Sequence, residues 1–91
     1  MGLKSTTTCL GYQQITSLTS STALTVPAGA SLALIVPETQ NVRWRDDGVD
    51  PTASVGMLVP ANSSMSYDGD LKAIRFIAVA SGAVLNVSYY A

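Results

Sequence analysis

Histidine is absent from the chain, cysteine occurs once, and charged residues make up only 12% of the 91 positions. Without histidine, the chain lacks the side chain that most often serves as a general acid or base near neutral pH. A single cysteine excludes a disulfide within one chain and leaves transition metals without most of their preferred ligands. These absences argue against an enzyme, and we expect no catalytic residue, no metal site and no cofactor.

The low charge also limits the partners. Average proteins carry about 25% charged residues, whereas this chain carries half of that and a net charge of −1. Binding to nucleic acid or to acidic membranes depends on a basic surface, and no apolar run approaches the roughly 20 residues that span a bilayer. We therefore expect neither nucleic acid nor a membrane as a partner. Because protein interfaces are depleted in charge, the composition favours a domain that functions while docked to other protein.

The residue pattern is that of an all-β protein. Short runs rich in Val, Ile, Thr and Tyr alternate with turn segments rich in Gly, Pro and Asp, and no stretch of twelve residues has helical periodicity. The predicted strands are residues 8–16, 22–26, 31–37, 41–46, 55–59, 64–67, 73–79 and 83–90. This spacing predicts a single small β-sandwich or jelly-roll-like barrel of about seven to eight short antiparallel strands. The β domain covers residues 9–91 and follows a flexible or extended N-terminal arm at residues 1–8.

Three local features refine this prediction. In residues 73–79 and 83–90, apolar residues occupy every second position, so each strand has one face in the core. Ser81-Gly82 between them is typical of a tight hairpin. Residues 32–36 read Leu-Ala-Leu-Ile-Val without alternation, which predicts cover on both faces, either within the domain or from a neighbouring subunit. Pro37 is expected to end this strand, because proline has no amide hydrogen to donate.

The candidate site is a dense block in the middle of the chain, Val42-Arg43-Trp44-Arg45-Asp46-Asp47-Gly48-Val49-Asp50. On a strand, Trp44 points one way while Arg43 and Arg45 point the other. One interpretation places Trp44 in the core and pairs the arginines with nearby carboxylates. The other places the arginines in an intermolecular contact, where arginine and aromatic residues are enriched. The two are compatible.

Arg75 and Tyr90 complete the set of interface candidates, since each lies on the outward side of a predicted strand. Most of the aspartates flank glycine or proline, where turns favour them for their local backbone hydrogen bonds. Residues 46–50 and 68–70 could also offer oxygen ligands to calcium, but neither has the ligand spacing of an EF-hand loop. An outward tyrosine could form part of a sugar platform, although a glycan site normally needs several aromatic rings.

Several segments, in this order, resemble small virion proteins of tailed bacteriophages. They lie at residues 42–48, 51–53, 56–57, 67–71, 73–77 and 83–90. Together the resemblance covers roughly residues 23–90, and the order of the segments is more specific than any one of them. Such proteins are compact β domains of the capsid or tail, and the resemblance implies no catalytic residue and no cofactor.

The resemblance implies a capsid decoration (cement) protein, made in the cytoplasm of the bacterial host and bound to the outer surface of the virion shell. Its partner would be the major capsid protein, with Arg43, Trp44, Arg45, Arg75 and Tyr90 as contact residues. Low charge and the apolar run at residues 32–36 also predict self-association, which we expect to give a trimer. The alternatives are a tail- or fibre-associated receptor-binding module, which would bind host glycans or surface proteins, and a head–tail accessory protein.

Overall fold

The computed structural model describes residues 8–91, and within them it contains strands and turns but no helix. Each strand overlaps one of the predicted ranges. The strands are β1 (Cys9–Ile15), β2 (Thr22–Ala23), β3 (Leu32–Glu38), β4 (Val42–Arg45), β5 (Met57–Val59), β6 (Met65–Tyr67), β7 (Arg75–Ala78) and β8 (Val84–Tyr90). The prediction of an all-β fold is therefore confirmed.

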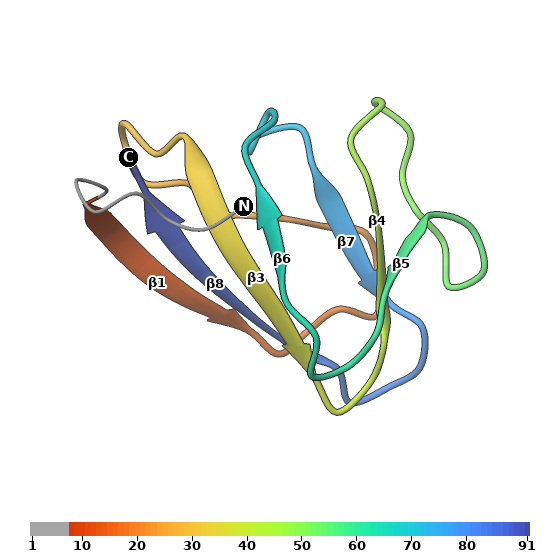
Figure 1. Ribbon diagram of the computed structural model, residues 1–91. Coiled ribbons are helices and arrows are strands. Elements are labelled where there is room, and N and C mark those ends of the chain that lie inside the picture. The colour runs from red at the N-terminus through yellow and green to blue at the C-terminus, as the bar shows by residue number, and fades with distance from the viewer. Residues whose placement is uncertain (1–7) are drawn as a thin grey trace.

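The strands form two antiparallel sheets of four. Sheet A has the order β1-β8-β3-β6, and sheet B has the order β2-β7-β4-β5. Figure 1 shows sheet A on the left, with β1 at its outer edge, and β7, β4 and β5 of sheet B on the right. The two sheets pack face to face over one apolar core, which is the β-sandwich that the sequence predicts.

The connectivity identifies the kind of sandwich. β1 pairs with β8, β2 with β7, β3 with β6 and β4 with β5. These are the pairs of one long hairpin whose tip is the β4–β5 loop, and successive pairs alternate between the two sheets. A long hairpin rolled up in this way gives the eight-stranded, double-sheet jelly roll.

The core consists of the inward residues of both sheets. In sheet A these include Leu85, Val87 and Tyr89 of β8, and in sheet B Phe76 lies fully buried opposite them. Among residues 8–91 the buried set contains no polar or charged residue type. The Tyr89 hydroxyl, the one polar tip in this part of the core, donates a 2.7 Å hydrogen bond to Gln13 Oε1. The alternation predicted for residues 73–79 and 83–90 is thus confirmed.

Two of the sequence predictions are wrong. Ser81-Gly82 does not form a hairpin, because β7 belongs to sheet B and β8 to sheet A, so the segment crosses from one sheet to the other. Pro37 does not end β3, which continues to Glu38 with Pro37 opposite Leu85 of β8. The lack of an amide hydrogen is tolerated because β6 pairs only as far as Ile35.

The apolar run at residues 32–36 is covered on one face only. Ala33 and Ile35 are fully buried, whereas Leu32, Leu34 and Val36 face outward and are half-buried. Cover of the second face from within the domain is therefore excluded for residues 8–91. Of the predicted N-terminal arm, residues 1–7 lie outside the described part, and Thr8 exchanges two backbone hydrogen bonds with Ala91, at 2.9 and 3.0 Å.

Candidate functional site

The three arginines of the predicted site lie together on the outer face of sheet B. Arg43 and Arg45 are alternate residues of β4, and Arg75 of β7 lies directly opposite Arg45. These are three of the five basic residues in the chain. Like charges placed opposite each other across two strands repel, so each arginine should have a partner that offsets this repulsion.

Arg43 is bonded to the loop that follows β4. Its Nη1 donates to the carbonyl oxygen of Gly56 at 2.9 Å, and its Nε donates to that of Ala53 at 3.2 Å. Gly56 has a φ of 143°, and a Cβ there would lie 3.1 Å from both the Trp44 carbonyl oxygen and the Arg43 Cβ. The guanidinium therefore fixes the close approach of the loop, residues 46–56, to β4.

The hydrogen-bond partners of Arg45 and Arg75 lie closer in the sequence than those of Arg43. Arg45 Nε donates to Asp47 Oδ1 at 3.0 Å, and the two side chains form an exposed ion pair. The hydrogen bond with Asp47 raises the pKa of Arg45, and the same bond lowers the pKa of Asp47. Arg75 donates to the carbonyl oxygens of Lys72, at 2.7 Å, and Ile74, at 3.1 Å. The predicted pairing with a carboxylate holds for Arg45, whereas Arg43 bonds backbone carbonyl oxygens instead. A role of the arginines in an interface stays a prediction.

Trp44 points to the opposite side of β4 and lies at the rim of the core. Its ring meets Tyr67 of β6 edge to face, with 5.7 Å between the ring centroids. The Tyr67 hydroxyl donates a 2.6 Å hydrogen bond to Asp46 Oδ2. Burial, followed by this hydrogen bond, raises the pKa of Tyr67 to about 12. The aromatic pair closes the gap between the sheets where sheet A ends at β6.

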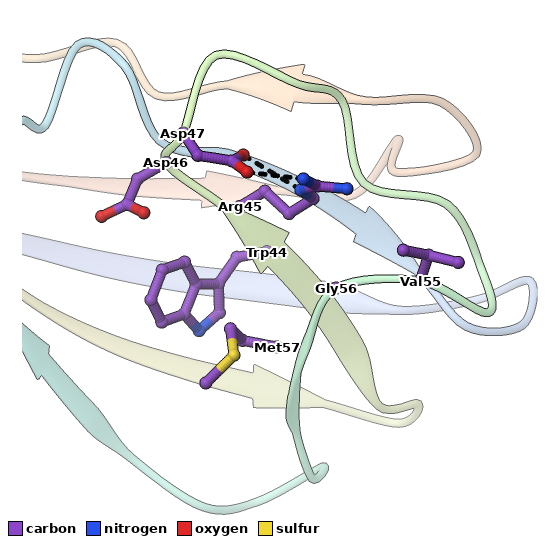
Figure 2. Close-up of a pocket in the computed structure, with 7 residues that line it drawn as sticks. All are labelled: Trp44, Arg45, Asp46, Asp47, Val55, Gly56 and Met57. Atoms are coloured by element: carbon purple, nitrogen blue, oxygen red, sulfur yellow. Dashed lines mark hydrogen bonds and ion pairs between the residues drawn. The ribbon is translucent and has the colours of Figure 1, made fainter.

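A pocket of about 320 Å³ opens beside Trp44. Figure 2 shows the Trp44 ring next to Met57 on one side of β4, and the paired Arg45 and Asp47 on the other. Val55 and Met57 are 51% and 59% exposed, so the pocket has an apolar wall that solvent reaches. An aromatic ring and aliphatic side chains with an ion pair at the rim can hold an apolar side chain or one face of a sugar.

Tyr90 lies on the other sheet. It ends β8, faces outward, and pairs with Cys9 of β1 and Leu32 of β3. The structure therefore divides the predicted site residues among three places: the arginines on the outer face of sheet B, Trp44 at the rim of the core, and Tyr90 on the outer face of sheet A. They do not form one contact surface.

The outer face of sheet A is a surface of which the predicted site includes only Tyr90. We use this name for the outward side chains of its strands: Cys9, Tyr12, Gln14, Leu32, Leu34, Val36, Glu38, Ser66, Val84, Asn86, Ser88 and Tyr90. Glu38 is the one charged residue in this set. The aliphatic residues of β3 lie at the centre of the face, with uncharged polar and tyrosine side chains around them.

A hydrogen-bond network centred on Asn86 joins three strands of this face. The hydroxyl of Tyr12 and the amide of Gln14, both on β1, donate to Asn86 Oδ1 at 2.5 and 3.1 Å. Asn86 Nδ2 in turn donates to Glu38 Oε2 at 2.6 Å and to the Val36 carbonyl oxygen at 3.2 Å, both on β3. The single carboxylate of the face is therefore engaged, and the network joins β1, β8 and β3 by side-chain hydrogen bonds.

Four of the five aspartates considered as calcium ligands have separate partners. Asp46 accepts from Tyr67, Asp47 from Arg45, and Asp50 from Ser21 at 2.9 Å, while Asp70 accepts from the Lys72 amide. Across residues 8–91, no three side chains of the His, Cys, Asp and Glu types come together as metal ligands. The carboxylates hold turns and strands in place in this structure.

Comparison with known proteins gives no relative: no family model, no curated protein and no solved structure matches the chain. Within the part that the structure describes, there is no helix that could cross a bilayer.

Proposed function

We propose that this protein is a structural component of a phage virion, a decoration protein that binds the outside of the capsid and stabilises the shell. The observation that carries the proposal is the outer face of sheet A, which is nearly free of charge and displays the half-buried Leu32, Leu34 and Val36. Interface centres are depleted in charge and rich in such residues. The jelly roll is also found among viral capsid domains, although a fold alone does not decide function.

Docking through this face explains the mechanism without any chemical step. Four strands about 4.8 Å apart, with a rise of about 3.4 Å per residue, give a face of roughly 400 Å². A stable protein–protein contact buries about 800 Å² on each partner. One copy would therefore bind the major capsid protein weakly, and many linked copies would resist internal pressure together through multivalency. Self-association is part of this proposal, because linked copies bind the shell more strongly than single copies do.

The test compares two variants that each place one carboxylate on a sheet face. Leu34 is half-buried at the centre of the outer face of sheet A, and Ile77 is half-buried on the outer face of sheet B, opposite Arg43. Leu34→Glu should abolish binding to particles that lack the protein, because a desolvated carboxylate would have no partner there. Ile77→Glu should bind like the wild type. Equal binding of both variants, with the fold verified by circular dichroism, would refute the assignment of the face.

The copy number in purified virions distinguishes the decoration protein from a head–tail accessory protein. A number comparable with that of the major capsid protein fits decoration of the whole shell. A number far below it fits a position at the tail or the connector.

The Trp44 pocket favours a second candidate, a receptor-binding module of the tail. The pocket places an aromatic ring beside the exposed Met57, and the exposed Val55 also lines it, an arrangement that can hold part of a host glycan. Such a module should bind host cells in the absence of the rest of the particle, and Trp44→Ala should remove this binding. A decoration protein should not bind host cells by itself.

A further inference from the structure

Among residues 8–91 no strand pairs with the outer side of β1, so this edge of sheet A is open over a whole strand. β1 has seven residues, Cys-Leu-Gly-Tyr-Gln-Gln-Ile, with neither a charge nor a proline. The other edge strands, β2, β5 and β6, have two or three residues each. Natural proteins usually protect long edges with charges, prolines or bulges, because an open edge pairs with other strands. The register shift between Cys9 and Gly11 protects only the beginning of β1.

The hydrogen-bonding groups at this edge can be assigned from the neighbouring strand. The carbonyl oxygen of Tyr90 accepts from Ser31, on the β3 side, whereas the backbone of Ala91 bonds with Thr8, on the β1 side. Alternate residues of β8 therefore bond to opposite neighbours, and the residues opposite Gln13 and Ile15 bond to β1. It follows that the N–H and C=O groups of Tyr12 and Gln14 point to the open edge.

The neighbouring segments that the structure describes leave this edge accessible. The segment at residues 25–27 lies under the inner face of β1, where the Thr25 amide donates to Gln13 Oε1 at 3.1 Å. On the outer side, the Tyr12 side chain is 63% exposed. In Figure 1, β1 is the outermost strand of sheet A, with none of the other strands beyond it.

We propose that β1 of one copy pairs antiparallel with β1 of a second copy, across a two-fold axis at Tyr12, so that two A sheets become one eight-stranded sheet. In this register Tyr12 lies opposite the partner's Tyr12, and their outward N–H and C=O groups bond each other. Leu10 lies opposite the partner's Gln14.

A second copy fits this edge better than a strand of different sequence for two reasons. Antiparallel pairing of a strand with itself is self-complementary about a two-fold axis. Because β1 carries no charge, this pairing brings no like charges together, and it places two tyrosine rings opposite each other, a favourable cross-strand pair.

The dimer has a consequence for docking. Joining two A sheets edge to edge doubles the outer face to roughly 800 Å², the area of a standard interface on one partner. The two-fold arrangement takes the place of the trimer expected from the sequence. The dimer is a property of the isolated protein and does not depend on the proposed role in the virion. Either proposal can therefore fail while the other holds.

The experiment measures the mass of the pure protein by light scattering after size exclusion, in the presence of a reductant. The wild type should have twice the chain mass of 9.5 kDa, about 19 kDa. Tyr12→Lys and Tyr12→Glu should each give 9.5 kDa, because two like charges would meet on the axis. An equimolar mixture of the two variants should return to the dimer mass. Met57→Lys, at an equally exposed position on the β5 edge, should remain dimeric.

A wild-type monomer or trimer at high concentration would overturn the proposal, as would a dimer that survives Tyr12→Lys or a mixture that stays monomeric. A second test, by disulfide cross-linking, detects the pairing even where the equilibrium between monomer and dimer favours the monomer. In a Cys9→Ser background, Tyr12→Cys should form a disulfide-linked dimer under mild oxidation, because the two Cα atoms would lie about 5.5 Å apart. Met57→Cys in the same background should form far less. Equal cross-linking of the two would contradict the β1 edge.

Discussion

Removal of the Arg43 side chain should destabilise the domain, whereas removal of Arg45 should not. Arg43 bonds two carbonyl oxygens of the loop at residues 46–56, and the bond to Gly56 is partly buried. Arg45 bonds only the exposed Asp47, two residues away. The sequence places both arginines in one interface, but the structure gives them different roles.

The magnitude follows from the two bonds. A hydrogen bond that involves a charged group contributes about 1.5–3 kcal/mol when protected from water, and much less when exposed. Counting the Gly56 bond in full and the Ala53 bond as a small addition gives about 2 kcal/mol for Arg43→Ala. In a domain of this size, that loss corresponds to a fall in Tm of roughly 8–16 °C. Lysine at position 43 should recover only part of it, because it lacks the planar fork of donors.

Thermal unfolding followed by circular dichroism provides the assay, with wild type, Arg43→Ala, Arg43→Lys and Arg45→Ala compared in the same buffer. The emission of the single tryptophan, Trp44, reports on the adjacent pocket. The reasoning is refuted if Arg43→Ala unfolds at the wild-type temperature, or if Arg45→Ala proves to be the less stable of the two alanine variants.

Three further substitutions test other contacts. Asn86→Asp replaces two donated hydrogen bonds by a carboxylate beside Glu38. Because this raises the pKa of the new carboxyl group above its unfolded value, the variant should be about 2–4 kcal/mol less stable at neutral pH, and the deficit should shrink as the pH falls through the raised pKa towards about 4. An acid titration of unfolding that shows a constant deficit would exclude this cause. Gly69→Ala places a Cβ on the hydroxyl and ring of Tyr67. It should therefore lower the free energy of unfolding by about 1–3 kcal/mol and shift the tryptophan emission. Unchanged emission and stability would show that the Tyr67 ring is free to move. Burial raises the pKa of Tyr89 to about 12. Since the unfolded chain ionises first, stability should be lost as the pH rises from about 10 through 12, and Tyr89→Phe should reduce this loss in urea titrations at alkaline pH.

The sequence predicts the strands well because their signal is local. Alternation in residues such as Ile74, Phe76 and Ala78 reflects burial of one face, which any arrangement of the sheets requires. The pairing of strands has no such signal, because a jelly roll joins β1 to β8 and β2 to β7 across most of the chain. For this reason Ser81-Gly82, which has the composition of a hairpin turn, is instead a crossing between the sheets.

For the candidate surfaces too, the sequence predicts what depends on local pattern and misses what depends on strand order. Residues 32–36 indicate a strand with two apolar faces, and the structure shows that its outward residues are half-buried at the centre of sheet A. The sequence identifies Arg43 as unusual but not its bonds to Ala53 and Gly56, because backbone acceptors leave no trace in composition. The open edge of β1 and the network around Asn86 also depend on strand order, so they emerge only from the structure.

A reconstruction of the intact virion at side-chain resolution tests the central claim most directly. The account predicts that the domain lies on the shell with Leu34 and Val36 against the major capsid protein. A domain that is absent from the virion, or that presents the outer face of sheet A to solvent, would contradict it.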